Sequence, residues 1–192
     1  MSPLTKALFD KAHSFIYMYN EKPFQLSSGK MSHHYFNCKK ITLNPEFLFL
    51  AVKAICDELI PENHLPIPEA VGGLTLGADP LAYGISLYYY QKNILCFPCI
   101  VRKEVKKHGT QKQIEGEIEN INHVVVLDDV ITTGNSTLKA IDAFRNAGKN
   151  VQYAICLVDR EEGGRETLLR EGVNLFSLWK KSDFTSLIDN NL

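Results

Sequence analysis

The sequence predicts an α/β protein with a mostly parallel central sheet, helices on both faces of that sheet and a small N-terminal hood lobe. Runs of apolar, β-branched residues such as 123–127 are typical of strands buried on both faces. These runs alternate with segments of helical periodicity over residues 45–158, which favours parallel strands joined by helices. The length of 192 residues, with 45% hydrophobic residues, fits one compact domain with a small lobe rather than two fused enzymes.

The N-terminal segment predicts a helix followed by a short hairpin. Apolar residues recur at helical spacing from Leu4 to Tyr19, after the helix-start signal Ser2-Pro3. Two brief strands, at residues 24–26 and 34–37, flank a turn-forming segment. We therefore expect residues 1–42 to form the hood and residues 43–192 to form the core.

The core segments follow in alternation. We expect helices over about residues 45–60, 81–90 and 137–147, and strands over residues 69–72, 94–101, 123–127 and 151–158. The strand at 123–127 has the clearest pattern, and Gly148 stands where a glycine commonly ends a helix. The elements assigned from the sequence end with this last strand.

Charge and cysteine content exclude several classes of protein. Lys and Arg number 21 against 22 Asp and Glu, a net charge of -1, which disfavours nucleic acid or an anionic membrane as a partner. No apolar run is long enough to span a membrane, and the N-terminus lacks a signal-peptide pattern. Five scattered cysteines favour reduced thiols in the cytoplasm. Cys96 and Cys99 have redox-motif spacing, but residues three apart in a strand point to opposite faces, so we expect both to pack in the core.

The segment that begins at Asp128-Asp129 carries the clearest chemical signal. A buried strand delivers these two carboxylates at its carboxyl end, where open α/β sheets bind ligands. A turn of Thr, Gly, Asn and Ser then opens a helix, whose N-terminal N–H groups suit a phosphate. The carboxylates can accept hydrogen bonds from vicinal hydroxyls, and the turn beside them can hold a phosphate. Together they predict a sugar-phosphate site. Two simpler interpretations stay open: a strand end followed by a helix cap, and a receiver domain.

Three further segments are candidate parts of the same site. Residues 102–112 hold five cationic residues and one acidic residue, a local charge of +4, which predicts either a mobile lid that closes over an anion or a solvated loop. The glycine-rich segment 72–80 follows a strand and permits close approach of the backbone to a phosphate. Arg160 follows another strand at the same sheet edge as Thr132 and can grip a carboxylate, unless it forms a surface salt bridge with Glu161 or Glu162.

The segment 125–137 resembles the phosphoribosyl-diphosphate signature of the type I phosphoribosyltransferases, and segments 24–30, 71–80, 102–109 and 159–160 resemble the orotate phosphoribosyltransferases. The resemblance implies the type I phosphoribosyltransferase fold. It also implies a pentosyltransferase of pyrimidine (UMP) biosynthesis that uses Mg²⁺ and transfers the phosphoribosyl group of 5-phosphoribosyl 1-diphosphate to orotate. It further implies a homodimer in which lid residues 102–116 complete the partner's site.

The resemblance also implies residue roles. Lys106, Asp128 and Asp129 are expected to be catalytic, Thr132 and Arg160 to bind orotate with Tyr35 and Phe36 beside the base, and no residue is assigned as a direct metal ligand. The residues expected to bind the sugar diphosphate are Arg102, Lys103, Lys106, His108, Asp128, Asp129, Val130, Ile131, Thr132, Thr133, Gly134, Asn135 and Ser136. Ser27 and Leu76 stand where some family members have lysine. A phosphoribosyltransferase for another base and a non-catalytic sensor of the sugar diphosphate are the alternatives.

Overall fold

The structure is a computed structural model that describes residues 1–25, 31–104 and 113–189. The described elements are α1 (Pro3–Ile16), β1 (Tyr17–Gln25), β2 (Met31–Phe36), α2 (Lys39–Thr42), α3 (Pro45–Ala54), η1 (Ile55–Leu59), α4 (Ile60–Glu62), β3 (Ala70–Leu74), α5 (Asp79–Tyr90), β4 (Phe97–Val101), β5 (Ile114–Glu115), β6 (Val124–Ile131), α6 (Asn135–Asn146), β7 (Tyr153–Asp159), α7 (Gly164–Arg170), β8 (Asn174–Lys180) and α8 (Lys181–Asp189).

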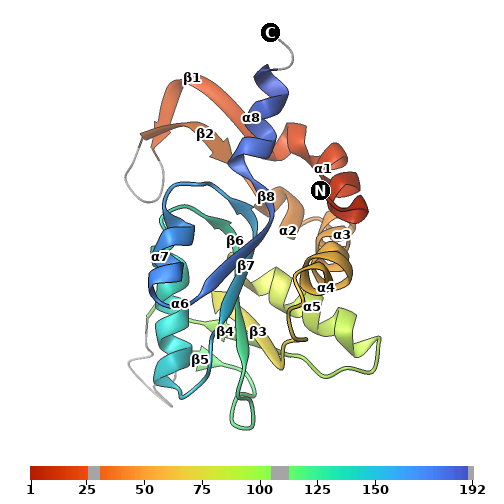
Figure 1. Ribbon diagram of the computed structural model, residues 1–192, viewed down its shortest axis with the longest axis vertical. Helices are drawn as coiled ribbons and strands as arrows, with labels where there is room; N and C mark the ends of the chain where they lie inside the picture. The colour runs from red at the N-terminus through yellow and green to blue at the C-terminus, as the bar shows by residue number, and fades with distance from the viewer. Residues whose placement is uncertain (26–30, 105–112, 190–192) are drawn as a thin grey trace.

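The central sheet confirms the predicted fold class. Its strand order is β5-β4-β3-β6-β7-β8, and all neighbours are parallel except β4 and β5. Helices α3 and α5 lie on one side of the sheet and α6 and α7 on the other (Figure 1). Each face buries its own apolar cluster: Leu127 of β6 joins the cluster that contains Ile85 of α5, whereas Val126 joins the one that contains Phe144 of α6.

The hairpin β1–β2 forms a separate, antiparallel sheet. Helix α1 ends at Ile16, earlier than the periodicity to Tyr19 predicts, because Tyr17 and Tyr19 pair with Phe36 and His34 across the hairpin. The ring of Phe184 in α8 lies 5.0 Å from Phe36 and 5.5 Å from Tyr17. Figure 1 shows the hairpin and α8 at the same end of the molecule. The C-terminal helix therefore packs against the hairpin.

Several elements differ from the sequence-based expectations. The central strand continues beyond 127 to Ile131, so Asp128 and Asp129 lie within it rather than after it. Three elements that the pattern did not predict, α7, β8 and α8, follow Arg160, and β8 forms the edge of the sheet beside β7. Cys96 and Cys99 are buried in opposite apolar clusters, which confirms that they pack in the core.

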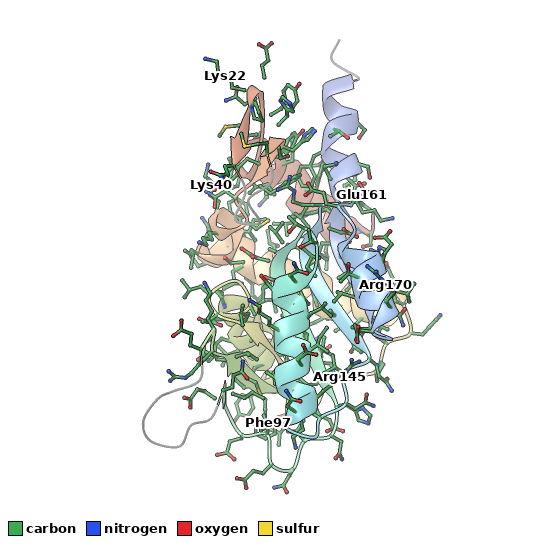
Figure 2. The ribbon with its side chains drawn as sticks, turned by 90° about the vertical axis from the view of Figure 1, so that its left-hand side faces the viewer. Lys22, Lys40, Phe97, Arg145, Glu161 and Arg170 are labelled. Carbon is green, nitrogen blue, oxygen red and sulfur yellow. The ribbon has the colours of Figure 1, made fainter. Side chains whose placement is uncertain are left out.

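The carboxyl ends of the parallel strands face the hairpin. Phe97 at the start of β4 lies near the bottom of the molecule in Figure 2, whereas Glu161 just after β7 lies higher, toward the hairpin. This edge is where open α/β sheets bind ligands. Within the described residues, none of the helices has the length and apolar character that crossing a lipid bilayer requires.

Candidate active site

A cleft of about 710 Å³ lies at this edge of the sheet. Its walls come from the end of the hairpin, the segment between β3 and α5, the end of β6, the turn before α6, and the residue that follows β7. Eleven of the predicted site residues line it: Lys103, Asp128, Asp129, Val130, Ile131, Thr132, Thr133, Gly134, Asn135, Ser136 and Arg160. Tyr35 and Phe36 line it as well. Segments that are far apart in the chain therefore meet in one cavity, as the sequence predicts.

Asp128 and Asp129 form a strained acidic pair at the floor of the cleft. Asp128 Oδ1 accepts a hydrogen bond from the Asp129 N–H at 3.0 Å, and its Oδ2 accepts one from Thr137 Oγ1 at 3.2 Å. Burial and the charge of Asp129 raise the pKa of Asp128 to about 8. A bound cation or sugar hydroxyls would relieve this unfavourable ionisation. The pair is thus suited to a ligand that brings positive charge or hydrogen-bond donors.

The turn between β6 and α6 presents a helix N-terminus to the cleft. Gly134, the residue before α6, has φ of +83°, a left-handed conformation that glycine adopts without strain. The first N–H groups of α6 have no acceptor within the helix, so they and the neighbouring hydroxyls can bind an anion. Thr137 at this helix start also holds Asp128, which links the turn to the acidic pair.

The segment between β3 and α5 packs directly against the acidic pair. A Cβ atom built on Gly77 would lie 2.7 Å from Oδ1 of both Asp128 and Asp129, so a larger residue there would force the carboxylates to move. Thr75 Oγ1 donates to Asp79 Oδ2 at 2.6 Å and ties the segment to the start of α5. The two walls of the cleft therefore meet at the carboxylates, while the expected approach of this glycine-rich segment to a phosphate stays a prediction.

Arg160 is buried, with 3% of its surface exposed, and connects the core to the hairpin. Its Nη2 donates to Ser32 Oγ at 2.9 Å and to the His34 carbonyl at 3.1 Å, and it pairs with Glu162 Oε1 at 2.7 Å. The Arg160 N–H donates to the Ile131 carbonyl, which brings Arg160 beside Thr132. The ion pair with Glu162 that the sequence allows does form, but inside the protein and beside the cleft.

The structure describes the two ends of the predicted lid, residues 102–116. Strands β4 and β5 pair with each other where the lid begins and ends, and the Arg102 guanidinium forms an ion pair with Glu115 at 2.8 Å. Of the predicted site residues that the structure describes, Arg102 alone does not line the cleft, because it faces Glu115. Lys106 and His108 lie outside the described residues.

Three residues that were not expected in the site also line the cleft: Asn37, Cys38 and Lys39. They lie between the hairpin and α3, outside any recognisable motif. The nearest signal is the adjacent pair Lys39-Lys40 at the boundary expected between hood and core. The contacts of Ser32 and Glu162 with Arg160 were also missed, because only the fold brings Ser32 to the end of β7.

The comparisons with known proteins agree with this geometry. No protein-family model matches the chain. The orotate phosphoribosyltransferase of Leptospira biflexa serovar Patoc is 51% identical over 178 residues, which are 93% of this chain and 96% of the relative. The chain belongs to the orotate phosphoribosyltransferase family.

Two further members of the orotate phosphoribosyltransferase family illustrate the similarity. The Aquifex aeolicus enzyme is 48% identical over 164 residues, covering 85% of this chain and 87% of that one. The crystal structure of Mycobacterium tuberculosis orotate phosphoribosyltransferase in complex with 5-phospho-α-D-ribosyl 1-diphosphate is 28% identical. It superposes with a TM-score of 0.74 over 95% of this chain and 99% of that one. The similarity therefore covers both the hairpin and the sheet.

Proposed function

We propose that this chain transfers the phosphoribosyl group of 5-phosphoribosyl 1-diphosphate to orotate, forming orotidine 5'-phosphate and diphosphate in pyrimidine biosynthesis. The observation that carries the proposal is the single cleft that joins the acidic pair, the N-terminus of α6 and the buried Arg160. These groups match a ribose, a phosphate and an anionic base. The identity of 51% to a curated family member supports the same substrates.

In the proposed complex, the sugar diphosphate lies along the floor of the cleft. The 5'-phosphate accepts hydrogen bonds from the N–H groups and hydroxyls of residues 132–137, where the α6 dipole favours negative charge. Asp128 and Asp129 accept hydrogen bonds from the ribose hydroxyls. The segment 74–77, which packs on the acidic pair, lies beside the diphosphate.

The acidic pair fits the Mg²⁺ ion that the family implies. Mg²⁺ prefers oxygen ligands and keeps several waters, so two carboxylates together with substrate oxygens form a suitable donor set. Burial beside Asp129 already makes ionisation of Asp128 unfavourable, which a cation would offset. No group of three His, Cys, Asp or Glu residues in the described ranges could hold a metal by itself. The ion would stabilise the negative charge of the departing diphosphate.

The base is proposed to bind between the hairpin and the end of β7. Arg160 offers a cation to the orotate carboxylate or ring oxygens, Thr132 lies beside it, and Tyr35 and Phe36 flank the ring. Orotate N1 then forms the new bond to ribose C1' and loses its proton to the departing diphosphate or to solvent. The bond from C1' to diphosphate breaks, and the electron pair of that bond leaves with diphosphate. The carboxylates of Asp128 and Asp129 stabilise the positive character of C1', so catalysis consists of positioning and charge complementation.

The proposal includes a homodimer in which lid residues 102–116 act on the partner's cleft, with Lys106 and His108 facing the diphosphate.

An apolar stripe on α5 supports self-association. Tyr83, Leu87 and Tyr90 share one face of this helix and are 50%, 64% and 66% exposed. Figure 1 shows α5 on the outer flank of the molecule, where a second copy can approach.

Two further parts of the proposal concern organisation and location. The separate hairpin sheet supports the division into a hood of residues 1–42 and a core of residues 43–192. All five cysteines are buried free thiols, which supports a reducing cytoplasmic location.

The substrate assignment is tested by diphosphate release from 5-phosphoribosyl 1-diphosphate with Mg²⁺ and one base at a time. Orotate, adenine, hypoxanthine and uracil are the panel. We expect release with orotate only, since Arg160 offers a buried cation that the neutral bases do not need. Release that depends on another base would refute the assignment, and binding of the sugar diphosphate without release with any base would indicate the non-catalytic sensor.

A further inference from the structure

The cleft offers few cations to a substrate that carries phosphate and diphosphate groups. Within the described ranges, the cationic side chains that line it are Lys39, Lys103 and Arg160. Arg160 already pairs with Glu162 and donates to Ser32, and Lys103 belongs to the lid that is proposed to serve the partner. The segment Leu74–Gly77 contributes no charged side chain to its wall. Lys39, outside the lid, is therefore a cation on the cleft wall that is free to meet the sugar diphosphate in the same chain.

Lys39 follows a residue that lies close to the acidic pair. It begins α2 and directly follows Cys38, which is 1% exposed and also lines the cleft. Burial, and then the charges of Asp129 and Asp128, raise the pKa of the Cys38 thiol, consistent with a position close to these carboxylates. The start of α2 thus borders the floor of the cleft, along which the sugar diphosphate is proposed to lie.

The neighbouring lysine shows what distinguishes Lys39. Lys40 Nζ donates to the Phe15 carbonyl at 2.8 Å, so its charge stabilises the end of α1. Figure 2 marks Lys40 at the level where the hairpin meets the core. By contrast, no hydrogen bond or ion pair to another described residue engages the Lys39 ammonium, although Lys39 is exposed on the cleft wall. The two adjacent lysines therefore have different surroundings.

We propose that Lys39 is a substrate-binding residue whose ammonium contacts the diphosphate group of 5-phosphoribosyl 1-diphosphate in the same subunit. A lysine ammonium is a compact charge on a flexible stem, which suits the many oxygens of a diphosphate. It would act together with the lid cations of the partner but would be present before the lid closes. The inference rests on the proposed function, because it takes the substrate from there.

The test compares Lys39→Gln with Lys40→Gln in the full chain, with Lys39→Arg as the charge-preserving variant. Three quantities are measured: the KM for the sugar diphosphate, the KM for orotate, and the inhibition constant of inorganic diphosphate. We expect Lys39→Gln to raise the KM for the sugar diphosphate and the inhibition constant of inorganic diphosphate about tenfold, because one charge-assisted hydrogen bond is lost. The KM for orotate should stay within about twofold. Lys39→Arg should restore most of the loss, and Lys40→Gln should leave all three within about twofold.

Calorimetric titration of the same variants with the sugar diphosphate alone separates this inference from the proposed function. If wild-type protein binds the sugar diphosphate but shows no orotate-dependent turnover, the proposed function fails, while weaker binding to Lys39→Gln would still support a contact of Lys39. Unchanged binding by Lys39→Gln, or equal losses in Lys39→Gln and Lys40→Gln, would overturn the inference, since either result excludes a local contact.

Discussion

Arg160 at the end of β7 and Ser32 in the hairpin, 128 positions apart in the chain, are joined by a hydrogen bond of 2.9 Å between Nη2 and Oγ. Ser32 Oγ also donates to the His34 carbonyl, which itself accepts from Arg160. The hairpin thereby fixes the orientation of the guanidinium that is proposed to bind orotate. Phe36 of the same strand lies 5.6 Å from the guanidinium carbon and lines the cleft beside it.

Ser32→Ala is therefore expected to weaken orotate binding without changing the sugar site. Losing one hydrogen bond to a charged group should raise the KM for orotate about tenfold, with the KM for the sugar diphosphate within about twofold. Steady-state kinetics with each substrate varied in turn gives both values. Ser182→Ala, at the exposed start of α8, is the control. Equal increases in both KM values would assign Ser32 a structural role only.

Asp128→Asn is expected to stabilise the protein at alkaline pH. The native pKa of about 8 lies above the ordinary aspartate pKa of 3.8, so between these values the native state keeps a proton that the unfolded chain has lost. The contribution of Asp128 to stability is therefore greatest below about pH 4 and falls as the pH rises to about 8. Asparagine cannot ionise, so it removes this dependence.

The melting temperature of the Asp128→Asn variant should exceed that of wild type by more at pH 8.5 than at pH 5, in buffer without divalent ions or substrates. The control is Asp142→Asn, which removes an exposed carboxyl on α6. Its melting temperature should differ from that of wild type by the same amount at pH 5 and at pH 8.5. A pH-independent difference for Asp128→Asn would show that the carboxyl ionises without strain.

Asp129→Asn should impair use of the sugar diphosphate more than orotate binding. The substitution keeps the shape of the side chain but removes a charge from the floor of the cleft, where the ribose is proposed to bind. We expect the KM for the sugar diphosphate to rise at least about tenfold, while orotate affinity, measured by calorimetry, changes less than about twofold. Equal losses for the two ligands would indicate that Asp129 supports the fold rather than the ribose.

Lys106→Ala tests the proposed lid. Cations that arrive on lid closure favour the transition state, in which charge develops on diphosphate, so kcat should fall by about two to three orders of magnitude. The melting temperature should not change. An unchanged kcat would remove Lys106 from the mechanism.

Mixing Lys106→Ala with Asp129→Asn protein tests whether the lid acts on the partner. A mixed dimer then contains one complete site, assembled from the intact acidic pair of one subunit and the intact lid of the other. Random exchange should restore about a quarter of wild-type activity. If the mixture stays as inactive as its components, the lid acts on its own subunit.

Leu87→Glu should disrupt the proposed dimer. This residue is the centre of the apolar stripe on α5, and burying a glutamate in an apolar interface is costly. Sedimentation should show a dimer for wild type and a monomer with reduced activity for the variant. Leu169→Glu on α7, which is 59% exposed on the opposite side of the sheet, is the matched control and should remain dimeric. A dimeric Leu87→Glu variant would place the interface elsewhere.

The parts of the site that the sequence could predict are local in the chain. The acidic pair and the turn up to Ser136 form one continuous segment, whose order of strand, carboxylates and helix start already specifies a sheet-edge site. The contacts of Ser32 with Arg160 and of Gly77 with the acidic pair join distant segments, so no local pattern reports them. Strand β8 was missed because its burial alternates irregularly at the sheet edge, unlike the continuous burial of β7.

A crystal structure with orotidine 5'-phosphate tests the assignment of the cleft most directly, because this product carries the phosphate, ribose and base together. We expect the 5'-phosphate on the N–H groups of residues 132–137, the ribose hydroxyls within hydrogen-bond distance of Asp128 or Asp129, and the orotate ring at Arg160. A nucleotide bound with its phosphate at Arg160, or outside this cleft, would refute the proposed binding mode.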